Sequence, residues 1–370
     1  MTQSVTLDDL DRRLVHALQV DGRAPFSRIA AVLGVPERTL ARRYHRLRSA
    51  LAVRVAGLVD SARIGMADWF VTLDCAPDAT ETLTSLLAQR DDTSWIAPLA
   101  GGGRLVCMVR TPAPGRPAGG PDGGRSFFEQ LARTPGVRDV QAGCVLRAVA
   151  GVGGWSGRTS ALDAAEQERL RTAAEPARSA VGGDGGAGSP STGDADGAAS
   201  SPGPGPDPGP TAWTEADARL AGELARDGRA DIRHLAEVTG WSASTTRRRI
   251  SRLRSTGVLH FEVDVDPAHF GAPLEALLWL DVAPGTLPTV TEALAGHAPV
   301  AFAAATTGRA AVFAMLQCRD AGALYEYLSR DLGALPGIRG AETALVQRRT
   351  KRAGTLLLPE RHSSPPKRAS

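Results

Sequence analysis

The sequence predicts an α+β protein that contains one unit twice, each unit combining a winged helix-turn-helix with a ferredoxin-like βαββαβ domain. Two observations support this fold class. Residues 7–65 and 213–271 align without a gap, and 22 of the 59 aligned positions are identical. Within each copy, apolar residues first recur at helical spacing and then in short runs typical of strands. A repeat of this length indicates one structural plan used twice.

The composition limits the classes of protein to consider. The chain has 370 residues, 42% hydrophobic and 22% charged, which is enough for several folded domains. It has no apolar run near the roughly 20 residues that a transmembrane helix needs. Its four cysteines form no CxxC pair, which argues against a disulfide scaffold and a thiolate zinc site. The acidic start over residues 1–13 does not resemble a signal peptide, so a cytoplasmic protein without a membrane partner is expected.

Positive charge is concentrated in three segments, although the net charge is only +3. Residues 36–54 hold six arginines and one acid, and residues 242–254 hold five arginines and no acid. Residues 347–370 hold seven basic residues and one glutamate. Clusters of this kind create a local field that attracts phosphates. The alternative interpretation of each cluster is a solvated helix face.

Each copy begins with an apolar stripe whose members lie three or four residues apart. The stripe consists of Leu7, Leu10, Leu14 and Leu18 in copy one and of Trp213, Ala216, Leu220 and Leu224 in copy two. An Asp-Gly-Arg sequence follows in both copies. We expect its glycine, Gly22 or Gly228, to adopt the left-handed conformation that ends a helix.

A second helix of about eight residues is predicted to end at Gly34 or Gly240, followed by a turn and an arginine-rich third helix. Pro36 suits the first position of that helix in copy one, and Ser242 suits the N-cap in copy two. A helix, a glycine-containing turn and a basic helix form the helix-turn-helix plan.

The third helix carries the predicted DNA contacts. Its buried face is predicted to consist of Leu40, Tyr44 and Leu47, or of Thr246, Ile250 and Leu253. On the opposite face, residues of the first turns would reach base edges in the major groove and later arginines would reach phosphates. The predicted DNA-binding residues are Arg38, Thr39, Arg42, Arg43, Arg46, Ser244, Thr245, Arg247, Arg248, Arg249 and Arg252.

The remainder of each copy alternates strands and helices. Residues 53–60 and 258–266 are interpreted as wing strands. The next segments follow the order strand, helix, strand, strand, helix, strand, which is the ferredoxin-like plan. They span residues 69–75, 80–89, 95–100, 105–110 and 126–132 in copy one and residues 276–282, 287–295, 300–306, 310–317 and 321–331 in copy two, each set followed by a last strand. The open face of each sheet needs a cover, and the other copy's sheet is the obvious one.

These segments divide the chain into six parts. They are the winged helix-turn-helix domains (1–62 and 213–270), the ferredoxin-like domains (66–150 and 272–350), a short helix with a linker (151–212) and a basic tail (351–370). Residues 176–210 are rich in Gly, Pro, Ser and Asp and contain no aromatic residue, which predicts a flexible, disordered linker.

The second copy contains the motifs Asp227-Gly228-Arg229, Gly257-Val258-Leu259 and Leu335-Pro336-Gly337-Ile338-Arg339. With these positions it resembles the Lrp/AsnC (feast/famine) family of transcriptional regulators, so the chain as a whole resembles a tandem duplicated form. The resemblance implies binding to double-stranded DNA and a sensor domain that pairs through its sheet. It also implies an effector that is an amino acid or a related metabolite.

The resemblance places the effector cleft at the glycine-rich turn between the second and third strands of the sheet domain. The implied effector-binding residues are Gly101, Gly102, Gly103, Arg104, Thr307, Gly308 and Arg309. The family's acidic residue, three positions after the glycine, is Val106 or Ala311 here. Its absence argues against a free amino acid, because no carboxylate remains there to pair an ammonium group.

The sequence therefore predicts a sequence-specific transcriptional regulator, an intramolecular pseudo-dimer that assembles into larger homo-oligomers. We expect no enzyme activity, catalytic residue, metal or cofactor, because no GxSxG, P-loop or HExxH motif is present.

Two alternatives remain open. Siroheme decarboxylases resemble the same regulators in fold, and some fuse two related halves, but the seven histidines here do not recur at equivalent places in the two copies. A DNA-free sensor or scaffold is the other, because copy one has Leu51 and Pro36 where the family has glycine and serine.

Overall fold

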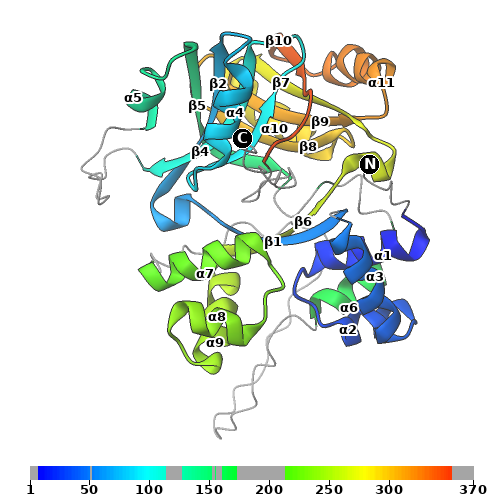
Figure 1. The fold of residues 1–370 in the computed structure, drawn as a ribbon. Coiled ribbons are helices and arrows are strands. Elements are labelled where there is room, and N and C mark those ends of the chain that lie inside the picture. The colour runs from blue at the N-terminus through cyan, green and yellow to red at the C-terminus, as the bar shows by residue number, and fades with distance from the viewer. Residues whose placement is uncertain are drawn as a thin grey trace, which may run out of the picture.

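The computed structural model describes residues 7–50, 52–113, 127–151, 155, 161–172 and 213–351. The predicted linker at 176–210, the basic tail beyond residue 351 and Leu51 lie outside the described residues. Two helical units lie side by side beneath a layer of strands, and two short strands run between the units and that layer (Figure 1).

Three helices form the helical unit of each copy, as predicted. They are α1 (Asp9–Val20), α2 (Phe26–Leu33) and α3 (Glu37–Ser49) in copy one, and α7 (Glu215–Arg226), α8 (Ile232–Thr239) and α9 (Ala243–Ser255) in copy two. Asp8 and Thr214 begin the first helices through reciprocal capping boxes with Asp11 and Asp217. The side chains of Asp11 and Asp217 are fully buried, and each also binds an arginine of the third helix.

The predicted ends of the second helices and starts of the third helices agree with the structure at three of four positions. Gly34 and Gly240 end the second helices with φ of 67° and 75°. Ser242 is the N-cap of α9 and accepts a hydrogen bond from the Thr245 N–H. Pro36 is the N-cap of α3 rather than its first helical residue, and no side chain caps that helix.

The two predicted wing strands pair with each other. β1 (Val53–Val59) runs antiparallel to β6 (Leu259–Val265), with Val53 opposite Val265 and Val59 opposite Leu259. Each strand therefore completes a two-stranded sheet that belongs to both copies. Apolar side chains of this sheet join those of both helical units in one hydrophobic core.

The prediction for the Asp-Gly-Arg glycines is wrong. Asp21 is the C-cap of α1 and Asp227 that of α7, and neither Gly22 nor Gly228 has a positive φ. Both glycines instead allow a close approach to the β1–β6 sheet. A Cβ atom on Gly22 would lie 2.7 Å from the Phe261 Cβ, and one on Gly228 would lie 2.9 Å from the Val55 Cγ1.

The ferredoxin-like halves have the predicted βαββαβ order. The strands are β2 (Met66–Cys75), β3 (Thr93–Pro98), β4 (Arg104–Pro112) and β5 (Val137–Ala150) in copy one and β7 (Leu274–Val282), β8 (Val300–Thr306), β9 (Val312–Cys318) and β10 (Ile338–Leu345) in copy two. The helices are α4 (Thr80–Ala88) and α5 (Phe127–Leu131), then α10 (Leu287–Gly296) and α11 (Ala321–Glu326), which continues as a π-helical turn over Tyr327–Leu332.

The two four-stranded sheets are continuous with each other. The strand order is β10-β7-β9-β8-β5-β2-β4-β3. The long strand β5 pairs with β2 through its first half and with β8 through its second half. At the other end, the chain after β10 bridges back to β3 through Val346 with Leu99 and Lys351 with Ile96. The last segment of each half therefore pairs with the sheet of the other half, and the arrangement has approximate two-fold symmetry.

Three apolar clusters fill the sheet layer. One lies between the copy-one sheet and its helices, and a second lies between the copy-two sheet and its helices. The third joins the inner faces of the two sheets through residues that include Phe70, Leu277, Phe313 and Met315. The sheets thus cover each other, as the sequence predicted.

Helix α6 (Ala164–Thr172) packs against α1 and α2 of copy one. Leu170 is fully buried there, Arg13 forms an ion pair with Glu166, and the Leu162 N–H donates 2.9 Å to the buried His16 Nδ1. The short helix after the first sheet domain, to which the sequence assigned no role, thus forms part of the copy-one helical core.

We expect Gly228→Ala to destabilise the fold by about 1–3 kcal/mol, because the added methyl group meets the Val55 backbone at 3.0 Å. Gly222→Ala is the matched control, since a Cβ at Gly222 meets nothing within 4 Å on the exposed face of α7. This control should stabilise the protein by about 0.5–1 kcal/mol through helix propensity. Urea denaturation of both variants measures the two effects, and equal behaviour would contradict the close approach.

Candidate nucleic-acid interface and ligand cavity

The two arginine-rich helices bury the predicted residues. Leu40, Tyr44 and Leu47 of α3 and Thr246, Ile250 and Leu253 of α9 are all buried. Spacing of three and four residues places these side chains on one face, so the basic residues must occupy the remainder of each helix.

The predicted DNA-binding arginines divide into two groups. In the first group, Arg43 and Arg249, which occupy equivalent positions, bind the capping acids of α1 and α7. Arg43 Nη1 lies 3.0 Å from Asp11 Oδ1, and Arg249 Nε and Nη2 each lie 2.6 Å from the carboxylate oxygens of Asp217. Arg46 also reaches Asp11, at 2.5 Å, although half of its side chain is exposed. These contacts tie the third helix to the first.

The Asp217 carboxylate is the better-defined of the two buried acids. Burial raises the pKa of Asp217, but hydrogen bonds from Arg249 and from the N–H and hydroxyl of Thr214 outweigh that effect and hold the pKa below its ordinary value. The same hydrogen bond with Asp217 raises the pKa of Arg249. The pair is therefore ionised at neutral pH and holds α9 on α7.

The second group of arginines is exposed and makes no ion pair within the described part of the chain. Its members are Arg38, Arg42, Arg247, Arg248 and Arg252. Arg42 and Arg248 are equivalent in the two copies. The remaining predicted contacts, Thr39, Ser244 and Thr245, lie in the first turns of the same helices, where Ser244 and Thr245 hydroxyls contact the capping Ser242 hydroxyl at 2.9 Å.

Reciprocal contacts fix the two helical units relative to each other. Arg48 at the end of α3 binds Asp227 at 2.8 Å, and its equivalent Arg254 at the end of α9 binds Asp21 at 2.9 Å. Arg23 donates to the Gly228 carbonyl oxygen at 2.7 Å, while the equivalent Arg229 donates to the Gly22 carbonyl at 2.8 Å.

These contacts were not predicted, although the sequence contains a signal for them. All of these residues belong to the positions that are identical in the two copies: Asp21, Gly22, Arg23 and Arg48, with Asp227, Gly228, Arg229 and Arg254. Their identity was interpreted as a turn and as part of a basic helix face. It reflects instead a two-fold interface in which each residue meets the other copy.

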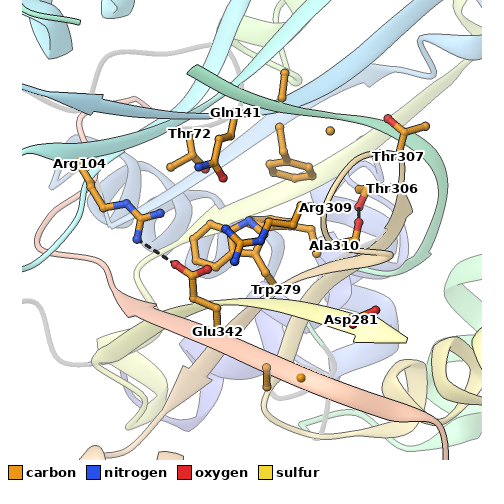
Figure 2. Close-up of a pocket in the computed structure, with 16 residues that line it drawn as sticks. Thr72, Arg104, Gln141, Trp279, Asp281, Thr306, Thr307, Arg309, Ala310 and Glu342 are labelled. Carbon is orange, nitrogen blue, oxygen red and sulfur yellow. Dashed lines mark hydrogen bonds and ion pairs between the residues drawn. The ribbon is translucent and has the colours of Figure 1, made fainter. Parts of the chain in front are cut away.

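A cavity of about 380 Å³ opens between the two sheets. Its walls come from both copies: β2, β4 and β5 of copy one face β7, β9, β10 and the β8–β9 turn of copy two. The sixteen lining residues are Phe70, Thr72, Arg104, Gln141, Ala142, Gly143, Trp279, Asp281, Thr306, Thr307, Arg309, Ala310, Phe313, Gly340, Ala341 and Glu342. Figure 2 shows the polar side chains around the opening, with Thr307 and Arg309 on the same turn.

The cavity joins an aromatic wall to a ring of charges. The Phe70 and Phe313 rings stack at 3.8 Å between centroids, and the Trp279 ring meets Phe313 edge-on at 5.6 Å. At the rim, Arg104 contacts Glu342 at 3.0 Å and Asp74 at 2.9 Å, as Figure 2 shows for the first pair. The hydrogen bond to Glu342 is the main cause of a raised Arg104 pKa.

Three of the seven predicted effector-binding residues line this cavity, namely Arg104, Thr307 and Arg309. The glycines Gly101, Gly102, Gly103 and Gly308 do not line it; they shape the turns, with φ between 71° and 98°. Trp279, Gln141, Asp281 and Glu342 were not predicted, because strands distant in sequence bring them to the cavity.

Metal-ligand clusters and membrane-spanning helices are the remaining features to report for the described residues. In that part of the chain, no group of three or more His, Cys, Asp or Glu side chains is placed to hold an ion. No histidine lines the cavity. Among the same residues, no helix has the length and apolar character needed to cross a membrane.

Comparison with known families identifies the domains. The AsnC-type helix-turn-helix domain matches residues 7–48 and again residues 214–254. The Lrp/AsnC ligand binding domain matches residues 275–356. These segments correspond to the helical units of both copies and to the sheet domain of copy two.

Individual proteins match one copy or the whole chain. The HTH-type transcriptional regulator FL11 of Pyrococcus horikoshii is 29% identical over 133 residues, which are 36% of this chain and 87% of FL11. LrpA1 of Halobacterium salinarum is 27% identical over 136 residues, 36% of this chain and 96% of LrpA1. The siroheme decarboxylase NirDL, solved with an iron-uroporphyrin III analogue, covers 94% of this chain with 93% of its own, at a TM-score of 0.54 and 16% identity. That likeness shows a common fold.

We expect Asp217→Asn to cost about 3 kcal/mol of stability at pH 7, because it removes the buried carboxylate charge that binds Arg249. The Asp217 pKa is lower in the folded chain than the unfolded value of about 4, so its contribution is complete above that value and is lost as the pH falls through the folded pKa. The difference from wild type should therefore be equal at about pH 7 and pH 5.5 and smaller at about pH 3. Denaturation at each pH measures it.

Glu215→Gln is the control for this prediction. Glu215 is 89% exposed and pairs with Arg219 on the same helix, so its loss should change stability by less than about 0.5 kcal/mol. A similar cost for both variants would contradict the structural role of Asp217.

Proposed function

We propose that this chain is a member of the Lrp/AsnC family, whose domain models match both helical units and the second sheet domain, and that it is a sequence-specific transcriptional regulator. In this proposal a single chain carries two DNA-reading helices and one effector cavity. The observation that carries the proposal is the fixed pairing of two helix-turn-helix units, each with exposed arginines on its third helix. In a single-copy relative, two chains are needed to present two such helices. Here the reading helices differ in sequence, which favours an asymmetric operator.

The two groups of arginines have separate roles in this proposal. Arg43 and Arg249 position their helices through the buried acids. Arg42 and Arg248, exposed at equivalent places, are proposed to contact DNA directly. The guanidinium group suits this role, because its planar fork donates two parallel hydrogen bonds to guanine or to a phosphate.

We expect Arg248→Ala to weaken binding to the preferred duplex by about 1–3 kcal/mol and to relax base preference at one position. Fluorescence anisotropy of the purified protein measures this, using a duplex selected from a random pool and a shuffled duplex, between about 50 and 200 mM salt. Affinity of the wild-type protein should fall steeply over that range as counterions are released. Arg42→Ala tests the equivalent position in copy one.

The matched control is Arg226→Ala, which removes an exposed arginine of α7 that pairs with Glu223. It should leave both affinity and base preference unchanged. If Arg248→Ala behaves like this control, the helix is not in the groove. If the wild-type chain binds neither duplex at low salt, the regulator proposal fails.

A second candidate function is a siroheme-decarboxylase-like enzyme, because the fold likeness to NirDL extends over nearly the whole chain. Against it, a tetrapyrrole with several carboxylates needs several free cations. Of the arginines that line the cavity, Arg104 is already paired with two acids. All the curated relatives compared above are transcriptional regulators.

Incubation with siroheme separates the two functions. If the protein is a regulator, we expect siroheme to be recovered with an unchanged molecular mass after incubation with the protein. Loss of carbon dioxide from siroheme, at a rate that depends on Arg309, would support the enzyme instead.

A further inference from the structure

We propose that the cavity between the sheets binds one molecule per chain of a flat, conjugated monocarboxylate. Its ring system would stack on Trp279, and its carboxylate would bind Arg309 and the hydroxyl of Thr307. The inference rests on the proposed function in taking this cavity as the effector site. It adds the chemical class, the stoichiometry and the orientation of the ligand.

The charges at the rim select an anion. Both carboxylates that line the cavity already contact arginines, since Glu342 binds Arg104 and Asp281 binds Arg339 at 2.8 Å. Among the described residues, Arg309 makes no ion pair, although it lies on an exposed turn at the cavity. An ammonium group would have to displace an existing partner, whereas a carboxylate meets a free guanidinium that can donate two hydrogen bonds.

Thr307 provides a second donor beside Arg309. Its hydroxyl oxygen accepts a hydrogen bond of 2.9 Å from the Cys144 N–H, so the hydroxyl hydrogen is available for another acceptor. Both residues lie on the β8–β9 turn and both line the cavity. A carboxylate has two acceptor oxygens, which these two donors can share.

The apolar part of the cavity suits a planar ring. Phe313 is 1% exposed and Phe70 is 7% exposed, so these rings form the base of the cavity. Trp279 is only partly buried and lines the opening, where a flat ligand can stack on its indole. The volume of about 380 Å³ lies at the lower end of the range for small-molecule sites, about 300–1,000 Å³, and suits a ligand of one or two rings.

Divergence between the copies gives the site one orientation. The sequence Asp74-Cys75-Ala76-Pro77 aligns with Asp281-Val282-Ala283-Pro284, which makes Thr72 the equivalent of Trp279. Both residues line the cavity, so only one side offers an aromatic ring. The Leu99 N–H donates to the Arg104 carbonyl oxygen as the Thr306 N–H donates to that of Ala311, which makes Gly102 the equivalent of Arg309. Only copy two therefore offers an arginine at this position of the turn. A symmetric pair of ligands is excluded by this asymmetry, and a single bound molecule follows.

Isothermal titration calorimetry of the full-length protein tests the proposal with three probes. These are 2-naphthoate, its neutral analogue 2-naphthamide and the non-planar cyclohexanecarboxylate. We expect 2-naphthoate to bind with one molecule per chain and at least about tenfold more tightly than either analogue, since the first lacks the charge and the second lacks the flat ring.

Two variants and a control locate the binding site. Arg309→Gln should weaken 2-naphthoate binding about tenfold while leaving 2-naphthamide unchanged. Trp279→Thr introduces the residue that copy one has at the equivalent position, Thr72. This variant should bind both 2-naphthoate and 2-naphthamide more weakly. Arg319→Gln is the control, because Arg319 is exposed, pairs with the adjacent Asp320 and does not line the cavity. It should bind all probes as the wild type does.

Several outcomes would overturn the inference. They are absence of 2-naphthoate binding, equal affinity for the amide, two molecules per chain, or unchanged binding in Arg309→Gln. Tighter binding of coproporphyrin III than of 2-naphthoate, dependent on Arg309, would also overturn it in favour of a polycarboxylate tetrapyrrole.

DNA titrations on the same samples separate this inference from the proposed function. Selective duplex binding without 2-naphthoate binding would remove the ligand inference alone. Binding of 2-naphthoate without any duplex binding would remove the regulator proposal alone. Arg309→Gln that keeps duplex binding and loses 2-naphthoate binding supports both.

Discussion

Two strands of seven residues, β1 and β6, pair antiparallel and hold the two helical units in one frame. The remaining contacts between the units depend on this pairing. Gly22 and Gly228 approach the strands where no side chain fits, which brings Arg23 and Arg229 to the carbonyl oxygens of the opposite copy. The reading helices are therefore placed by a shared sheet and by reciprocal ion pairs. Their spacing does not depend on the segment that joins the copies.

The arginines of the third helices differ in whether they bind a buried carboxylate. An arginine that meets a buried carboxylate is fixed, because a buried charge without its partner is strongly unfavourable. Asp11 and Asp217 therefore hold Arg43 and Arg249 as supports for the helices. An arginine that faces water without a partner remains free to meet a phosphate or a base. Arg42 and Arg248 are of this second kind, one residue earlier on each helix.

Duplication also allowed the sheet domains to diverge around a common axis. The cavity contains equivalent positions from both copies, but copy one has Thr72 where copy two has Trp279, and Gly102 where copy two has Arg309. A dimer of identical chains would repeat each residue across the axis. One fused chain can specialise the two sides separately. This asymmetry is the basis for assigning the site a single ligand orientation.

The sequence by itself determined the element order, the buried faces of α3 and α9, and the N-cap at Ser242, because helical spacing and capping are local properties. It also predicted that the sheets cover each other. The family resemblance implied seven effector-binding residues, of which Arg104, Thr307 and Arg309 line the cavity. Only the tertiary structure decided that β1 pairs with β6, that the Asp-Gly-Arg segments form an interface, and that Trp279 and Glu342 join the cavity. Each of these contacts links residues far apart in sequence. The spacing of residues along the chain predicts which of them share a face, but not which distant residue each one contacts.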